Sequence, residues 1–398
     1  MTSLLNAGMK KINDLNTHYY SLSSKELSDL GLINRLKTYN WSFELISIAL
    51  IVLMYIVYKL GSNTNLKTAN KIFKTLNNYL SNNFARVGFN DKKNGENKKL
   101  KYLSENMDTS FTGYASGRYY IESCIIKLHM SARFNPLGSL VESLLRYALP
   151  SLFMDNSPEY LELTITPNNV SLTSKNQTAT TAEPLPPKFK FISAIVSKNC
   201  MSKSRDDNYF LSLTQTTESP TLPVEFVYMS EANQLNPMFN KLGKGDLPNL
   251  LRKSKWFLNY IAFTDLPKDK PTNEKEWETG SSPRCVISCR VTSKAQDLEL
   301  LTKLINYVFS VYESITDSPE TSLILSTDVL KKVAHTRTNE LNKIKKATKQ
   351  LELDLAREKK QKELKEQKRK EGKSSADIDF EMEAKRERRR RNKQKLRG

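Results

Sequence analysis

One apolar run, Leu45–Tyr58 (LISIALIVLMYIVY), constrains this chain more than any other feature of its sequence. Trp41 and Phe43 precede the run and Lys59 follows it, so the run with its flanks covers residues 41–60. In a helix, which rises about 1.5 Å per residue, about 20 residues match a hydrocarbon core about 30 Å thick. The run therefore predicts one transmembrane helix.

A buried core helix and a secretory signal sequence are the two alternatives to a transmembrane helix. A core helix shows a polar face, whereas this run is apolar on every side except at Ser47. A signal sequence starts near the N-terminus and ends at small residues, but here residues 1–40 are polar and no such cleavage site follows. The transmembrane prediction fits better. Side chains that suit the headgroup region stand at both ends of the run: Trp41, Glu44, Tyr55, Tyr58 and Lys59.

Basic residues beside the run predict its orientation. Two precede it and four follow it: Arg35 and Lys37, then Lys59, Lys67, Lys71 and Lys74. Because Lys and Arg near a span stay on the cytosolic side, we expect a short luminal tail over residues 1–40 and a cytosolic C-terminal part. Two glycosylation sequons, at Asn169 and Asn176, make this orientation testable.

Cysteine and histidine usage points to a reducing compartment and to no metal. The four cysteines are too few and too scattered for a disulfide framework: Cys124, Cys200, Cys285 and Cys289. The three histidines show no ligand spacing: His18, His129 and His335. We expect neither a metal site nor a cofactor.

Positive charge is concentrated at the C-terminal end. From residue 331 onward the chain carries 25 Lys and Arg against 12 Asp and Glu, a net charge of +13 out of +19 for the whole chain. The last segment, Glu383–Gly398, is rich in arginine, and an acidic stretch, Asp377–Glu383, precedes it. Its candidate contacts to an anionic surface are Lys385, Arg386, Arg388, Arg389, Arg390, Arg391, Lys393, Lys395 and Arg397.

One interpretation of this basic segment is a solvated charge run without a partner. Otherwise, two partners fit it. Lys and Arg neutralise the phosphates of RNA with release of counterions, and they also attract anionic lipid headgroups. The segment has no interleaved aromatic residues, so it would bind an RNA backbone without reading bases. A helix that leads away from the membrane favours RNA, and a ribosome would present it.

The rest of the chain divides into a membrane-proximal part, a folded domain and a long charged helix. Within residues 61–110 we expect a helix over Lys67–Phe84 and a polar linker over Asn90–Lys101. We expect an α+β domain over residues 111–316 and the charged helix with its basic tip over residues 317–398. Strands are expected at Tyr119–Met130, Tyr160–Thr166, Lys188–Ser197, Val224–Met229, Trp256–Phe263 and Cys285–Val291.

Three helices and two loops are expected within the domain. Asn135 and Pro136 suit the start of a helix that ends before Pro150. A short helix is expected at Leu247–Lys255, and a longer one at Ala295–Ile315. The longer helix carries an apolar stripe expected in the core: Leu298, Leu301, Ile305, Val308 and Val311. Polar loops are expected at Asn168–Pro187 and Pro267–Pro283.

From Pro319 the composition predicts helix that is coiled-coil-like only at its start. Leu341, Ile344, Leu351 and Leu355 follow a heptad seam, with Thr348 in its middle. The next seam positions are charged, at Glu358, Lys362 and Lys365, so a self-sufficient coiled coil is not supported. Pairs of opposite charge three and four residues apart favour a solvated single helix from there on.

No motif of a known enzyme chemistry is present. The nearest approach to a glycine loop is GYASG at residues 113–117, which precedes a strand, whereas phosphate-binding loops open onto a helix. A turn is the simpler interpretation. His129 falls in an expected strand and is interpreted as a packed histidine. We expect no enzyme activity.

The order of these features resembles the coiled-coil-domain-containing protein 47 family, also called calumin, in its shorter fungal endoplasmic reticulum form. The resemblance covers residues 45–398 and rests on the single span, on Ser116-Gly117-Arg118, on Trp256–Asp265 (WFLNYIAFTD) and on Asp297–Ile315 running into the charged helix. It implies an endoplasmic reticulum membrane protein whose domain is cytosolic. For the animal members, the resemblance implies a translocon-associated factor that works beside the ribosome and helps multipass membrane proteins to insert.

One departure from the animal pattern bears on function. Animal members carry a long acidic luminal region associated with calcium binding, whereas residues 1–40 here hold three acidic and five basic residues. The leading hypothesis is a translocon- or ribosome-associated factor in membrane-protein biogenesis. The alternatives are a lipid-facing scaffold or membrane-contact adaptor, and a calcium-homeostasis protein of the endoplasmic reticulum; the latter needs a luminal carboxylate cluster that this sequence lacks.

Overall fold

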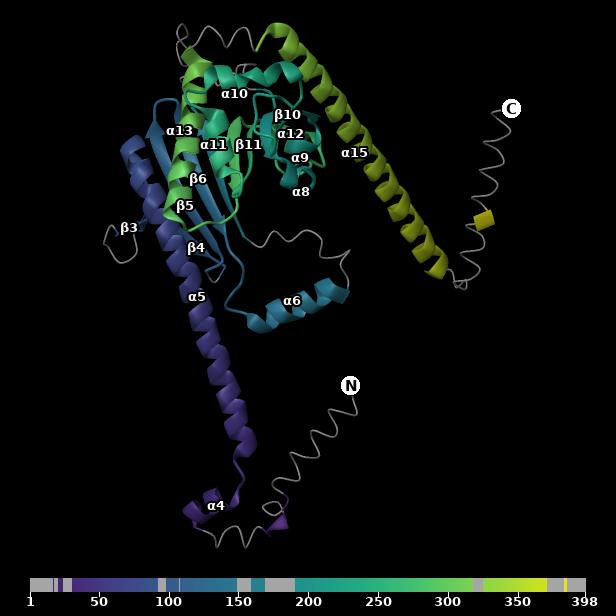
Figure 1. Ribbon diagram of the computed structural model, residues 1–398. Helices are drawn as coiled ribbons and strands as arrows, with labels where there is room; N and C mark the ends of the chain where they lie inside the picture. The colour runs from purple at the N-terminus through teal and green to yellow at the C-terminus, as the bar shows by residue number, and fades with distance from the viewer. Residues whose placement is uncertain are drawn as a thin grey trace. The chain divides into compact units, whose positions relative to one another are not determined.

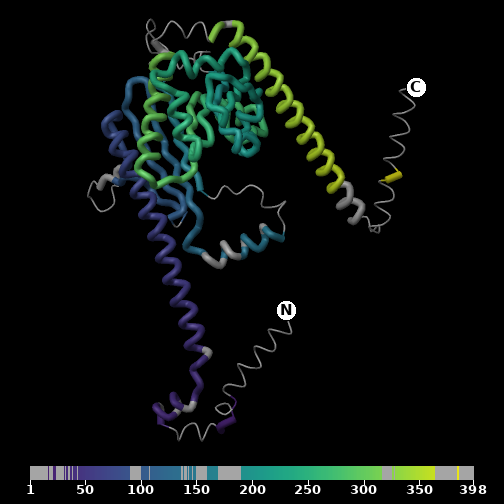
Figure 2. The backbone as a smooth tube through the Cα atoms, in the orientation of Figure 1, coloured from purple at the N-terminus to yellow at the C-terminus, as the bar shows by residue number. Residues whose placement is uncertain are grey.

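A computed structural model of the chain describes residues 17, 21–23, 31–91, 98–106, 108–148, 159–168, 190–317, 325–370 and 383–384. Figure 2 traces the backbone, with the residues of uncertain placement in grey. Both glycosylation sequons and the basic residues from Lys385 onward lie outside the described residues, as does all of the expected loop Asn168–Pro187 except its first residue.

The described chain forms two compact units. The first holds residues up to Ala115 with Ile125–Glu162 and Arg290–Leu298, and the second holds Ser116–Cys124, Leu163–Cys289 and the residues from Glu299 onward. Three strands, β5, β6 and β7, contribute residues to both units. The elements up to β7 are α4 (Leu32–Thr38), α5 (Ser42–Asn83), β1 (Arg86–Val87), β2 (Phe89–Asp91), β3 (Lys98–Leu100), β4 (Leu103–Glu105), β5 (Ser110–Arg118), β6 (Ile121–His129), α6 (Pro136–Ala148) and β7 (Tyr160–Pro167).

The first unit packs the C-terminal half of α5 against strands (Figure 1). Its strand order is β1-β5-β6-β7, with β4 antiparallel to β5 and a separate antiparallel ribbon of β2 and β3. The buried side chains of α5 recur at helical spacing: Ala69, Ile72, Phe73, Leu76 and Leu80. The ring of Phe73 lies over Gly113 of β5, where an added Cβ atom would come within 2.6 Å of Phe73 Cε1.

The second unit is an antiparallel sheet covered by helices. Its strand order is β7-β12-β11-β8-β10-β9, and the pairs from β12 through β9 are antiparallel. The remaining elements are β8 (Ser193–Ser197), α8 (Met201–Asp207), α9 (Tyr209–Ser212), β9 (Gln215–Thr217), β10 (Phe226–Ser230), α10 (Pro237–Leu242), α11 (Leu247–Ser254), β11 (Leu258–Thr264), α12 (Glu274–Gly280), β12 (Arg284–Cys289), α13 (Ala295–Asp317) and α15 (Thr327–Lys370), with short 3-10 turns at Lys198–Cys200 and Asn233–Leu235.

Helix α13 confirms the expected apolar stripe. All five stripe residues, from Leu298 to Val311, are fully buried. The mixture of helices with antiparallel sheet confirms the α+β prediction. Five expected strands are present, as β7, β8, β10, β11 and β12; four have slightly shifted ends, whereas β8 begins at Ser193, five residues later than expected. The helix expected at Leu247–Lys255 is α11.

Several local expectations were wrong. Residues 113–117 are not a turn but part of β5, and the strand expected at Tyr119–Met130 begins only at Ile121, because a turn at Tyr119 and Tyr120 joins β5 to β6. The expected linker Asn90–Lys101 contains the paired strands β2 and β3. The expected loop Pro267–Pro283 contains α12, which Asn273 caps by accepting a hydrogen bond from the backbone N–H of Glu276 at 2.9 Å.

Candidate functional site

Helix α5 has two halves of opposite character. In its N-terminal half the apolar side chains are exposed on every side; Ile46, Ile51 and Leu53, for example, are 66%, 64% and 59% exposed. Among the described residues, α5 is the one helix long and apolar enough to cross a membrane. A surface that is apolar all round does not suit water, so this half suits an apolar environment such as a membrane.

The boundary between the two halves is tied to the segment that precedes α6. An added Cβ atom at Gly61 would lie 2.3 Å from the carbonyl oxygen of Arg133, so the backbones of α5 and this segment touch. The rings of Tyr58 and Phe134 pack edge to face with centroids 5.9 Å apart. The Asn65 side-chain amide donates to the carbonyl oxygen of Ser131 at 3.0 Å. The end of the apolar run is thereby fixed to the first unit.

A buried ion cluster holds the base of the charged helix α15. The guanidinium of Arg337 donates to both carboxylate oxygens of Glu231 at 3.0 Å and also pairs with Asp265. The three side chains are only 11%, 1% and 6% exposed. Glu231 also accepts a hydrogen bond from the backbone N–H of Ile192 at 2.9 Å. The cluster joins α15 to the ends of β10 and β11.

Burial sets the acid–base behaviour of this ion cluster. Desolvation raises the pKa of Glu231, although the charge of Arg337 opposes that rise. Desolvation alone would lower the pKa of Arg337, but the carboxylates of Glu231 and Asp265 more than offset it and raise that pKa. The guanidinium therefore stays charged, and it supplies the positive charge that two buried carboxylates need.

Apolar contacts extend the attachment of α15 on both sides of Arg337. Val329 and Val333 are buried before it, and Ile344 is buried after it in a cluster that includes Trp277. The hydroxyl of Thr348 donates to the carbonyl oxygen of Thr272 at 2.8 Å. A cavity of about 440 Å³ lies between α15 and the residues around α12.

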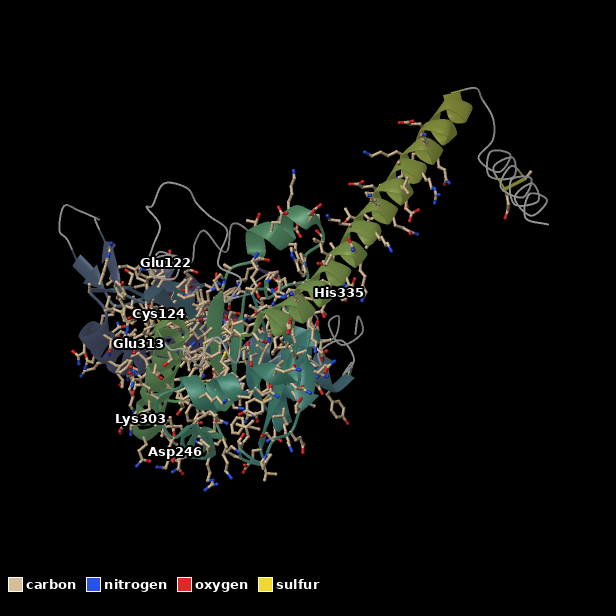
Figure 3. All side chains as sticks on the ribbon, turned by 90° about the horizontal axis from the view of Figure 1, so that it is seen from above. Glu122, Cys124, Asp246, Lys303, Glu313 and His335 are labelled. Atoms are coloured by element: carbon tan, nitrogen blue, oxygen red, sulfur yellow. The ribbon has the colours of Figure 1, made fainter. Side chains whose placement is uncertain are left out.

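Beyond Thr348 the helix leaves the folded unit. Leu351, Leu353 and Leu355 are 62%, 58% and 49% exposed, and Figure 3 shows side chains of both charges along the emerging helix. The expected heptad seam is thus split. Its first part, Leu341 and Ile344, packs on the chain's own core, and its second part faces outward; a coiled coil with another helix stays a prediction.

The motif Ser116-Gly117-Arg118, on which part of the family resemblance rests, has a structural role. Gly117 has a positive φ of 93°, which favours glycine, and it lies near the end of β5 just before the turn. The next residue, Arg118, pairs with Glu313 of α13 at 2.7 Å, and its guanidinium lies 4.7 Å from the centroid of the Phe309 ring. Figure 3 labels Glu313. The motif is therefore a structural connection between the strand and α13.

The sequence-predicted site residues and the residues that the structure brings together are different sets. The candidate basic contacts, Lys385 to Arg397, lie outside the described residues. Sequence reasoning missed Arg337, Glu231 and Asp265 as a unit. The only sequence signal was Asp265, an acidic residue at the end of an otherwise apolar strand motif. His129, as expected, is a packed residue, stacked on Tyr160 with ring centroids 5.3 Å apart.

No metal centre is found in the described part of the chain. Within it, no group of three or more His, Cys, Asp and Glu side chains is placed to hold a metal ion. The four cysteines are free thiols.

The thiols are expected to differ sharply in reactivity. Burial raises the pKa of Cys124 to about 12, and Cys285 and Cys289 are also fully buried with raised pKa values. Cys200 is partly exposed. Maleimide labelling of the native protein at neutral pH followed by mass spectrometry should therefore modify Cys200 first, and the other three only after unfolding. Labelling of Cys124 in the native state at the rate of Cys200 would contradict this packing.

Comparison with known proteins adds a family to this geometry. Residues 40–397 match the family described as PAT complex subunit CCDC47. The chain is 38% identical over 354 residues to a UPF0674 endoplasmic reticulum membrane protein of Saccharomyces cerevisiae, covering 87% of this chain and 86% of the relative. It is 25% identical over 270 residues to a UPF0674 endoplasmic reticulum membrane protein of Schizosaccharomyces pombe, covering 67% of this chain and 65% of the relative. The match over nearly the whole chain, together with the apolar half of α5, means that this protein belongs to the CCDC47 family of endoplasmic reticulum membrane proteins.

Proposed function

We propose that this protein is a non-enzymatic factor of membrane-protein biogenesis that works beside the translocon and the ribosome at the endoplasmic reticulum. In this proposal α5 crosses the membrane once, the N-terminal tail is luminal and the two folded units are cytosolic. The family's description as a subunit of the PAT complex supports a role within a membrane assembly.

One observation carries the proposal, namely how α15 is attached and where it leads. The ion cluster at Arg337 fixes the base of the helix, and Thr348 makes the last hydrogen bond from α15 to the folded unit within the described residues. From there to Lys370 the helix continues for about 33 Å at about 1.5 Å per residue. A helix fixed at its base holds its far end at a distance from the folded unit, and this far end precedes the basic segment.

The basic segment supplies a binding chemistry without sequence preference. Its Lys and Arg side chains would contact the phosphate backbone of ribosomal RNA, with counterion release as the driving force. Such binding weakens in proportion to the number of phosphate contacts as salt is raised. Anionic lipid offers the same chemistry, and a protein whose basic segment contacts only lipid would be a membrane scaffold instead.

A charge-removal experiment tests the ribosome role. We expect that replacing Arg388, Arg389, Arg390 and Arg391 with Gln lowers ribosome co-sedimentation of the full-length protein and reduces the slope of log K against log salt by about 3, at about 0.7–0.9 per lost contact. Replacing Lys359, Lys360, Lys362 and Lys365 with Gln removes the same charge from α15 and is the matched control.

The outcomes separate the two roles. A slope that falls only for the arginine variant supports contact between the basic segment and RNA. Equal loss in both variants would mean that net charge alone matters. Unchanged ribosome binding, together with lost binding to vesicles of anionic phospholipid, would overturn the ribosome role in favour of the scaffold.

A further inference from the structure

Helix α6 exposes its apolar face. Val141, Leu144 and Leu145 are 53%, 61% and 41% exposed, and Tyr147 at the edge of this face is 92% exposed. Val141, Leu144 and Leu145 recur at helical spacing, so they share one side of the C-terminal half of this 13-residue helix as an apolar stripe. In water such a stripe is unfavourable, and it requires an apolar surface to cover it.

The start of α6 is fixed beside the end of the apolar run of α5. The backbone at Arg133 touches Gly61, and Phe134 packs on Tyr58. Asn135 then caps α6, because its side-chain oxygen accepts a hydrogen bond from the backbone N–H of Gly138 at 2.9 Å. Pro136 comes three residues after Arg133, which limits their separation to about 11 Å. Helix α6 therefore begins close to Gly61.

This position corresponds to the surface of the membrane. If α5 crosses the bilayer over residues 41–60, as proposed above, then Tyr58 and Gly61 lie where the hydrocarbon core meets the headgroups. A tyrosine with an apolar ring and a polar hydroxyl is typical of this zone. Helix α6 thus starts at the depth at which amphipathic helices bind lipid.

The charge of α6 distinguishes it from the basic segment. Its only charged residues are Glu142 and Arg146, so the helix carries no net charge. Nearby, Arg133 pairs with Glu159. Attraction to anionic headgroups therefore contributes little, and burial of the apolar stripe is left as the driving force.

We propose that α6 is an interfacial helix that lies in the leaflet next to Gly61, with its Val141–Leu144–Leu145 face among the acyl chains of that leaflet. The inference rests on the proposed crossing of α5. The helix would give the first unit a second attachment to the same membrane, which fixes the orientation of this unit as a single span cannot. The partner that covers this apolar face is lipid, and neutral lipid is sufficient for binding.

A depth measurement on the full-length protein tests the proposal. In a Cys200→Ser background, whose other cysteines are buried, single cysteines are introduced by Leu144→Cys, Ser143→Cys or Ile51→Cys and labelled with the fluorophore NBD. The protein is reconstituted in phosphatidylcholine vesicles with doxyl labels at acyl carbon 5 or 12, and iodide reports contact with water. Ser143 is the matched control, since it is an exposed neighbour off the apolar stripe.

The NBD probe at position 144 should be quenched more by the shallow doxyl label than by the deep one and should be protected from iodide. The probe at position 143 should stay accessible to iodide, and adding phosphatidylserine should leave the quenching at 144 unchanged. Equal iodide access at 143 and 144, or a probe at 144 shielded from both iodide and doxyl lipid, would overturn the proposal; the second result would mean that protein covers the stripe. The probe at 51 reports on the span by itself, because lack of deep quenching there would refute the crossing of α5.

Discussion

Replacing Arg337 with methionine is expected to lower the free energy of unfolding of the second unit by about 3–5 kcal/mol. The substitution keeps most of the side-chain volume but removes a positive charge. Among the described residues, Arg337 is the only basic residue that forms ion pairs with Glu231 and Asp265. Two buried carboxylates would then lie close together without a counter-charge. Urea unfolding in mild detergent, followed by limited proteolysis with detection of α15 fragments, measures the loss.

Two further variants distinguish this loss from a general effect of removing an arginine. Arg357 pairs with Asp354 on the exposed part of α15, so Arg357→Met should change stability by no more than about 0.5 kcal/mol. Combining Arg337→Met with Glu231→Gln and Asp265→Asn removes the buried charges and should recover much of the loss. If Arg337→Met is no more destabilising than Arg357→Met, the ion cluster does not hold α15.

Replacing Phe73 with alanine should destabilise the first unit by about 3–5 kcal/mol, because a fully buried ring is lost and leaves a cavity. The ring contacts Gly113 and packs near Tyr102, at 5.0 Å between centroids, so neighbouring backbone cannot easily fill the space. Chemical unfolding followed by tyrosine fluorescence measures the change.

Lys74 is the neighbouring exposed residue of α5, and Lys74→Ala serves as the matched control. It should leave the midpoint of unfolding almost unchanged, since alanine is a good helix former and no buried contact is lost. A similar effect of both substitutions would show that the C-terminal half of α5 is not part of the core of the first unit.

Features that depend on local spacing were predicted from the sequence. The apolar run of α5, the stripe of α13 and the cap of α6 at Asn135 are each encoded within a few turns of helix, so periodicity alone identifies them. The division of the heptad seam was foreseen only in part. Its charged end was visible, but nothing local indicates that Leu341 and Ile344 pack on the chain's own core.

Features that depend on contacts far apart in the sequence were not predicted. Gly113 looks like a turn residue, yet it lies in a strand, where the ring of Phe73, 40 positions earlier, occupies the space that a side chain would need. Arg337 looks like any other basic residue of a charged helix, and only the folded sheet brings Glu231 and Asp265 to it. The continuity of α5 was missed for a related reason. Its middle is polar, and it is the buried Asn65, which donates to the carbonyl oxygens of Asp108 and Ser131, that holds this polar part in place.

The most direct test of the whole account is the topology of the full-length protein in sealed endoplasmic reticulum microsomes, with a tag at each end. We predict that added protease removes the C-terminal tag and spares the N-terminal one, and that Asn169 and Asn176 carry no glycan. A protected C-terminal tag with glycans on these asparagines would place the folded units and the basic segment in the lumen, and it would contradict the ribosome role.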